Sequence, residues 1–188
     1  RRQETERVVD VALDCLTGFR KPKILEIGTG SGCISIAIAK ERADSDILSV
    51  DISQDALTKA QYNANINNIN NVTFSKLDFM KELPDKRFDL IISNPPYISK
   101  NEMNTIMLDV REFEPDIALT DNHDGLEFYR RFCNTIKQLI NKKGFMVLEV
   151  GLGEHPIKAY NIFHSAGFDQ LELIPDYNND LRVLKIEI

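Results

Sequence analysis

Short apolar segments alternate with amphipathic segments along most of this chain, and this alternation constrains the fold more than any other feature. Apolar runs typical of buried strands lie at 23–28, 46–52, 72–77, 88–93, 145–150, 168–174 and 181–188. Apolar residues recur with helical spacing at 34–42, 54–67, 125–140 and 155–166. Strand–helix alternation of this kind predicts an α/β fold, in which helices cover both faces of a parallel sheet.

The C-terminal end of the chain departs from this alternation. Its last two strand segments are separated only by the turn-rich stretch 175–180, so if they are adjacent they pair antiparallel. We therefore expect a mostly parallel seven-stranded sheet that ends in an antiparallel hairpin. The polar stretch 97–122 is long for a connection, which indicates a functional or a mobile segment.

Length and composition narrow the class of protein. A chain of 188 residues predicts a single domain spanning residues 1–188. The formal net charge of −6 disfavours strong, non-specific binding to nucleic acid. Three widely spaced cysteines predict neither a disulfide framework nor a zinc site, and we expect a reducing, cytoplasmic location. No apolar run reaches the ~18 residues of a membrane span. Because the chain begins with Arg1 rather than methionine, we expect a processed protein or a fragment.

A glycine-rich segment, Gly28-Thr29-Gly30-Ser31-Gly32, connects the first strand to the first helix. Glycines allow a tight turn and the close approach of a ligand, and the following helix offers free N–H groups to an anion. The spacing is G-x-G-x-G, which differs from the dinucleotide pattern G-x-G-x-x-G, and the lysine of an ATP-binding P-loop is missing. A glycine turn without a ligand is the alternative.

Asp51 ends the second strand. A carboxylate at this position of an α/β sheet can accept hydrogen bonds from both hydroxyls of a ribose. Alternatively, it only precedes the helix that Ser53 caps. Together with the glycine segment, Asp51 predicts a cofactor that contains adenosine.

The tetrad Asn94-Pro95-Pro96-Tyr97 follows the fourth strand. The prolines stiffen the backbone and leave their carbonyls free as acceptors, and Asn94 adds a side-chain carbonyl. Tyr97 offers a flat ring on which a planar group can stack. Fixed acceptors beside a ring suit a planar NH₂ group, either an amide or the exocyclic amine of a base. A rigid turn would explain the prolines but not Asn94 and Tyr97.

S-adenosylmethionine accounts for all three features. Its ribose would bind Asp51, its amino-acid end would lie against Gly28 to Gly32, and its methyl group would point toward the end of the fourth strand. We therefore expect S-adenosylmethionine as the cofactor and, by fold, a Rossmann-like class I S-adenosylmethionine-dependent methyltransferase.

These motifs resemble those of the HemK/PrmC family, the protein-(glutamine-N5) methyltransferases of peptide-chain release factors. The similarity extends from Arg2–Glu6 to the closing segments Asp176-Tyr177 and Leu181–Val183. It rests on the following segments: Ile27–Cys33, Asp51, Asn94–Tyr97, Glu114-Pro115, Ala118-Leu119 and Asp124–Leu126. The tetrad alone is shared with adenine methyltransferases of DNA and RNA.

The resemblance implies a role for each matching residue. Residues Gly28, Thr29, Gly30, Ser31 and Gly32 would hold the methionine part of the cofactor, with Asn94 beside them. Asp51 would take the ribose hydroxyls, and Asp78 and Phe79 would flank the adenine. Asn94, Pro95, Pro96 and Tyr97 would bind the glutamine amide, and among these Asn94, Pro95 and Tyr97 would be catalytic.

Further expectations concern partners. The resemblance implies a release-factor substrate and a helical N-terminal domain in other family members that this chain lacks. Glu4 and Glu6 would line the path of the peptide, or they are simply surface carboxylates at a helix start. We expect a monomer that binds neither membrane, nor nucleic acid directly, nor a metal. A glutamine methyltransferase of a ribosomal protein, an N6-adenine-type DNA or RNA methyltransferase and a non-catalytic cofactor-binding module stay open as alternatives.

Overall fold

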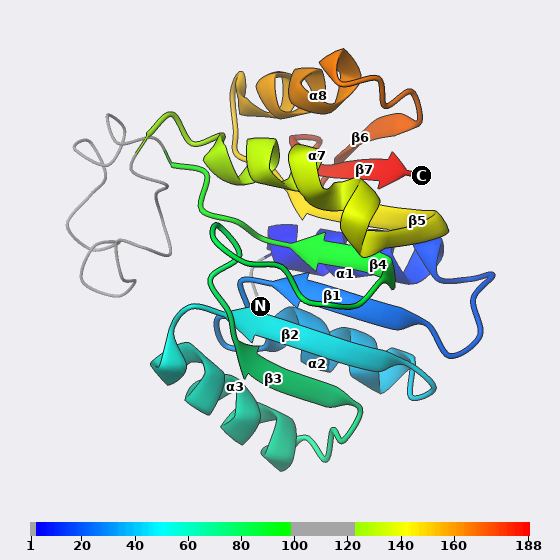
Figure 1. The fold of residues 1–188 in the computed structure, drawn as a ribbon, viewed down its shortest axis with the longest axis vertical. Coiled ribbons are helices and arrows are strands. Elements are labelled where there is room, and N and C mark those ends of the chain that lie inside the picture. Colours follow the sequence, from blue (N-terminus) through cyan, green and yellow to red (C-terminus); the bar gives the residue numbers. More distant parts are fainter. Residues whose placement is uncertain (1–2, 99–122) are drawn as a thin grey trace.

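A seven-stranded sheet forms the centre of the molecule (Figure 1). The computed structural model describes residues 3–98 and 123–188. The strands are β1 (Lys23–Ile27), β2 (Asp46–Asp51), β3 (Val72–Lys76), β4 (Phe88–Ser93), β5 (Ile140–Glu149), β6 (Leu171–Pro175) and β7 (Leu181–Glu187). Their order is β3-β2-β1-β4-β5-β7-β6, and only β7 runs antiparallel to its neighbours β5 and β6. The predicted fold class, a mostly parallel sheet with a C-terminal antiparallel hairpin, is confirmed.

Helices cover both faces of the sheet. The described helices are α1 (Gln3–Cys15), α2 (Cys33–Glu41), α3 (Gln54–Ile66), α7 (Glu127–Leu139) and α8 (His155–Ser165). In Figure 1, α7 and α8 lie in front of the sheet, whereas α1 and α2 lie behind it. Helix α3 packs on β2, β3 and α2, at the side of the sheet where β3 is the outer strand.

Alternating residues of the central strands supply two separate cores. Leu25, Ile91 and Leu148 pack in the core that contains α7 and α8. Their chain neighbours Ile24 and Leu90 pack in the core that contains α1 and α2. This follows from strand geometry, because successive side chains point to opposite faces and both faces are covered.

Several element boundaries differ from the prediction. The helix expected over 125–140 begins at Glu127, because Gly125 has φ +81° and cannot occupy a helical turn. Asp124 therefore does not cap the helix directly; it accepts a hydrogen bond from the backbone N–H of Leu126 (3.0 Å). Strand β5 begins at Ile140, five residues before the expected segment 145–150, and it runs through Lys143, which has φ +64°.

Part of the sequence similarity falls on residues that the structure does not describe. Glu114-Pro115 and Ala118-Leu119 lie outside the described residues, as does the side chain of Glu4. Within residues 3–98 and 123–188, no helix has the length and apolar character that crossing a membrane requires.

Candidate functional site

The predicted binding residues follow strands that are neighbours at the centre of the sheet. From β1 the chain continues to β2 and β3 on one side, whereas β4 and β5 lie on the other, so the order reverses between β1 and β4. Ligands of open α/β sheets bind beyond the carboxyl ends of the strands at such a reversal. The two strand ends are joined here, because the Ser93 hydroxyl donates to the Ile27 carbonyl oxygen (2.6 Å).

The glycine loop, residues 28–32, lies directly beside the tetrad, residues 94–97. A Cβ atom built on Gly28 would lie 3.8 Å from the backbone oxygen of Asn94. Gly28 and Gly30 have φ of +82° and +52°, and a Cβ on Gly30 would meet nothing within 4 Å. The loop therefore presents bare backbone to open space at the edge where the tetrad begins, which is the arrangement that the sequence predicts.

Asp51 closes the other side of the glycine loop. One carboxylate oxygen accepts from the Gly30 N–H (2.9 Å) and the other accepts from the Ser53 N–H (2.8 Å). The side chain is half-buried at the end of β2. Ser53 also caps α3 as expected, because its hydroxyl accepts from the Ala56 N–H (3.3 Å). Both interpretations of Asp51 are thus compatible with its position, and its contact with ribose stays a prediction.

Sequence reasoning missed a buried carboxyl group behind the loop. Glu26 is 1 % exposed and accepts from the Ser49 hydroxyl (2.5 Å), which in turn lies 2.6 Å from the Thr29 hydroxyl of the loop. Burial raises the pKa of the Glu26 carboxyl to about 7, against the opposing effect of the Ser49 hydrogen bond. Among the described residues, its Oε1 atom has no hydrogen-bond partner. The sequence signal that could have found Glu26 is a lone acidic residue inside an apolar strand.

The two residues predicted to flank adenine differ in exposure. Asp78 is half-buried in the turn after β3, where it pairs with Lys81 (2.9 Å). The Phe79 side chain is only 4 % exposed, and the place of this residue beside the adenine stays a prediction. Its ring packs 4.8 Å from the Phe132 ring, and its carbonyl accepts from Arg131 (2.9 Å). The Phe79 ring therefore belongs to the core and offers no open face to a base.

Tyr97, the last residue of the tetrad, is held by side chains from two strands. Pro95 is buried, whereas Asn94, Pro96 and Tyr97 are half-buried. The Tyr97 hydroxyl contacts Glu149 at the end of β5 and Arg182 at the start of β7. Neither Glu149 nor Arg182 was singled out from the sequence.

One sequence signal could have found Glu149. The segment Leu148-Glu149-Val150-Gly151 repeats the pattern of Leu25-Glu26-Ile27-Gly28, with an acidic residue where a buried strand approaches its end. In both cases the carboxyl group is 1 % exposed. A lone acidic residue within an apolar strand therefore indicated a buried polar group in each case.

His155, at the start of α8, also packs against the tetrad. Its ring lies 5.7 Å from the Tyr97 ring. Its Nδ1 atom accepts from the Gly151 N–H (3.0 Å), so its Nε2–H donates to the Gly125 carbonyl (2.9 Å). His155 thereby links the β5–α8 connection to the residues that precede α7.

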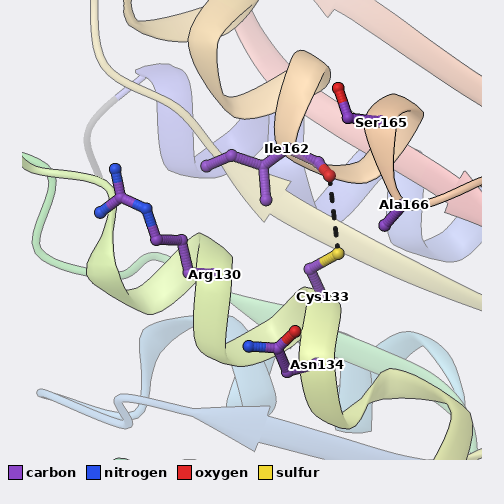
Figure 2. Close-up of a pocket in the computed structure, with 6 residues that line it drawn as sticks. All are labelled: Arg130, Cys133, Asn134, Ile162, Ser165 and Ala166. Atoms are coloured by element: carbon purple, nitrogen blue, oxygen red, sulfur yellow. Dashed lines mark hydrogen bonds between the residues drawn. The ribbon is translucent and has the colours of Figure 1, made fainter.

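A groove between α7 and α8 is separate from this site. Figure 2 shows its lining, in which the Cys133 thiol of α7 donates to the Ile162 carbonyl of α8 (3.6 Å). The groove has a volume of about 350 Å³, and none of its lining residues is a predicted site residue. Within the described part of the chain, no cluster of histidine, cysteine and acidic residues could hold a metal.

Comparisons with known proteins identify the family and the fold that this chain resembles. The family model of the methyltransferase small domain matches residues 5–111. A release factor glutamine methyltransferase of Fusobacterium nucleatum is 36 % identical over 97 % of this chain and 52 % of its own length. Another, of Thermodesulfovibrio yellowstonii, is 33 % identical over 99 % of this chain and 67 % of its own length. A methyltransferase structure from Pyrococcus furiosus superposes with a TM-score of 0.65 at 18 % identity, over 95 % of this chain and 82 % of its own, a likeness in fold.

The family model matches more than half of the chain, which shows that the chain belongs to the methyltransferase small domain family. More narrowly, the chain belongs to the release factor glutamine methyltransferase family, as the sequence motifs indicated. It spans between 52 % and 67 % of the length of four release factor glutamine methyltransferases that it matches.

Proposed function

We propose that this chain transfers a methyl group from S-adenosylmethionine to the side-chain amide nitrogen of a glutamine in a peptide-chain release factor. The observation that carries the proposal is the contact between the glycine loop and the tetrad at one edge of the sheet, with Gly28 beside the Asn94 carbonyl. The names of the curated relatives support the choice of substrate. We further propose that the chain acts as a monomer in the cytoplasm, on protein rather than nucleic acid.

The residues around the loop suit S-adenosylmethionine. The buried Glu26 carboxyl, with its unsatisfied Oε1 atom among the described residues, suits a ligand whose amino-acid end carries an ammonium group. The N-terminus of α2, which follows Gly32, suits the carboxylate of the same amino acid. Asp51 would hold the ribose hydroxyls and Asp78 would lie beside the adenine. When bound, the cofactor supplies an electrophilic methyl group.

Asn94 and Pro95 would orient the amide. An amide nitrogen is a poor nucleophile because its lone pair is delocalised into the carbonyl group. The Asn94 side-chain oxygen and the Pro95 carbonyl oxygen would each accept one amide hydrogen, which aims the nitrogen and favours positive charge on it. Such positioning can contribute ~7–11 kcal/mol to lowering a barrier, and fixed dipoles add to it.

A general base is not needed for this reaction. Once the nitrogen has gained a methyl group it is acidic, and it can release one proton to water. The four tetrad side chains contain no group whose pKa suits a base near neutral pH. The tetrad would therefore act through geometry and dipoles, with the Tyr97 ring lying against the planar amide.

The proposal is tested by the dependence of transfer on the acceptor residue. The chain is incubated with methyl-labelled S-adenosylmethionine and a release factor, or with the same factor carrying glutamine-to-glutamate at its acceptor position. We expect label in the first protein and none in the second. Label in a ribosomal protein or in an oligonucleotide but not in the release factor would replace the proposal with one of its alternatives.

A further inference from the structure

An ion pair between Glu149 and Arg182 lies directly behind Tyr97. Arg182 donates to the Glu149 carboxylate (3.2 Å) and to the Tyr97 hydroxyl (3.1 Å). The Tyr97 hydroxyl donates to the same Glu149 oxygen (3.3 Å), which closes a ring of three hydrogen-bonded groups. The guanidinium carbon of Arg182 also lies over the Tyr97 ring, 5.6 Å from its centroid. One end of the tyrosine is thus fixed by two opposite charges.

This ion pair is almost completely removed from water. The side chains of Arg182 and Glu149 are 6 % and 1 % exposed. Burying two charges costs desolvation energy, and well-packed apolar residues in their place are often as stabilising or more so. A contribution to stability is therefore a weak explanation for the pair. A requirement for one fixed geometry at Tyr97 explains it better, because charged hydrogen bonds are directional.

The antiparallel direction of β7 brings Arg182 to this position. Glu149 at the end of β5 is paired with Val183, and the Val150 N–H donates to the Arg182 carbonyl (2.8 Å). Because β7 runs against β5, its first residues lie at the edge where the parallel strands end. A parallel β7 would place its last residues there instead. The C-terminal hairpin thus delivers a buried cation to the edge that holds the tetrad.

The edge of the Tyr97 ring is closely packed as well. A Cβ atom built on Gly151 would lie 3.0 Å from Tyr97 Cδ2, so only glycine fits there without a shift. The His155 ring lies 5.7 Å away at an angle of 60°. With its hydroxyl anchored and its edge packed, the ring has little freedom to rotate.

We propose that Arg182 and Glu149 are positioning residues that hold the Tyr97 ring in the orientation required to receive the glutamine amide. This inference rests on the proposed function for the identity of the amide. The ordering of Tyr97 itself is a property of the chain alone. The two parts can therefore be tested separately.

The ordering is tested by NMR of the chain carrying ¹³C-labelled tyrosine rings. The sequence has five tyrosines and no tryptophan, so the Tyr97 signal can be assigned from its loss in Tyr97→Phe. We expect Arg182→Met to shift the Tyr97 signal and to speed the flipping of its ring. The matched control is Lys185→Met. Lys185 lies on the same strand as Arg182, but its charge pairs with Glu172, so its removal should leave the Tyr97 signal unchanged. An unchanged Tyr97 signal in Arg182→Met would overturn the proposal whatever the substrate is.

The catalytic consequence is tested by a double-mutant cycle in single-turnover transfer. We expect Arg182→Met to lower the rate ~10–100-fold at saturating cofactor, with unchanged affinity for S-adenosylhomocysteine. In the Tyr97→Phe background the same change should lower the rate less than about threefold, because the hydroxyl through which Arg182 holds the ring is already absent. Arg182→Lys, which keeps one charged donor, should recover part of the rate. Equal losses in both backgrounds would show a general structural role and overturn the proposal.

Failure of the proposed function would be recognised separately. If the wild-type chain transfers no methyl group to any release factor, the substrate assignment fails while the NMR experiment still decides whether Arg182 orders Tyr97. If the wild type is active and Glu149→Gln and Arg182→Met match its rate, the positioning role fails and the function stands.

Discussion

At the scale of single residues, Asn94 has the most specific role in the proposed reaction. Asn94 is half-buried and its backbone oxygen lies beside Gly28, while its side-chain oxygen is proposed to accept an amide hydrogen. We predict that Asn94→Ala and Asn94→Asp both lower the single-turnover rate ~100-fold or more at saturating cofactor, because each removes the oriented amide dipole. Rates near that of the wild type in both variants would show that this side chain does not orient the substrate.

Glu26 makes stability depend on pH. Burial raises the pKa of its carboxyl from an ordinary 4.5 to about 7, so the folded state holds this proton more tightly than the unfolded state. The resulting stabilisation is fully present below pH 4.5 and is lost as the pH rises through about 7. We predict that Glu26→Gln, which stays neutral, removes this loss. Between pH 5 and pH 8 the unfolding free energy of the variant should therefore fall by ~1–3 kcal/mol less than that of the wild type.

The measurement for Glu26 is urea unfolding of the chain without cofactor at both pH values. The control is Glu41→Gln at the end of α2, because that carboxyl is exposed and the charge change is identical. The control should keep the pH profile of the wild type. If Glu26→Gln also keeps it, the Glu26 carboxyl does not titrate as its burial implies.

The sequence placed individual site residues well where a motif was strong. Asp51 lies at the predicted edge because it ends a predicted strand, and the tetrad lies there because it directly follows one. The packing of the Phe79 ring in the core could not be predicted, because an aromatic residue after a strand suits either the core or a ligand, and only the position of Phe132 decides between them. Arg182 lies in the segment Leu181–Val183 that carries part of the family resemblance, but its role was not predicted, because the sequence shows no reason for a buried arginine until Glu149 is known to face it.

At the scale of elements, the turn from the glycine loop into α2 requires a residue without a side chain. Gly32 has φ +78°, and a Cβ atom there would lie 2.9 Å from the Cβ of Ala60 in α3. We predict that Gly32→Ala destabilises the chain by ~2–4 kcal/mol, from left-handed strain and from crowding between α2 and α3. Thermal or urea unfolding measures the effect.

Gly30→Ala is the matched comparison for Gly32. Gly30 also has positive φ, at +52°, but a Cβ there would meet nothing within 4 Å. Its cost should be only the strain of ~1–2 kcal/mol. Equal destabilisation by the two variants would mean that the contact between α2 and α3 does not restrict Gly32.

Elements that a local apolar pattern marks were mostly predicted, whereas boundaries that depend on pairing with another strand were not. Strands β1, β2 and β4 were found within a residue or two because apolar runs and following glycine, serine or proline bound them. Helix α1 was not predicted beyond a possible helix start at Glu4 and Glu6, although Val8, Val9, Val11 and Ala12 are buried on one of its faces. The early start of β5 depends on the pairing of Ile140 with Phe88, which no local pattern encodes.

At the scale of the whole molecule, topology gathers residues that are distant in sequence. The glycine loop, Asp51 and the tetrad meet because β2, β1 and β4 are adjacent and parallel. The hairpin then adds Arg182 from the opposite strand direction. The parallel part of this arrangement follows from strand–helix alternation, whereas the insertion of β7 between β5 and β6 could not be derived from the sequence.

The chemical identity of the methylated product tests the central claim most directly. The chain is incubated with methyl-labelled S-adenosylmethionine, a release factor and an adenine-containing oligonucleotide in one mixture, and the products are hydrolysed and separated. The account predicts label in N5-methylglutamine from the release factor alone. Label recovered as methyladenine, with the release factor unmodified, would contradict it.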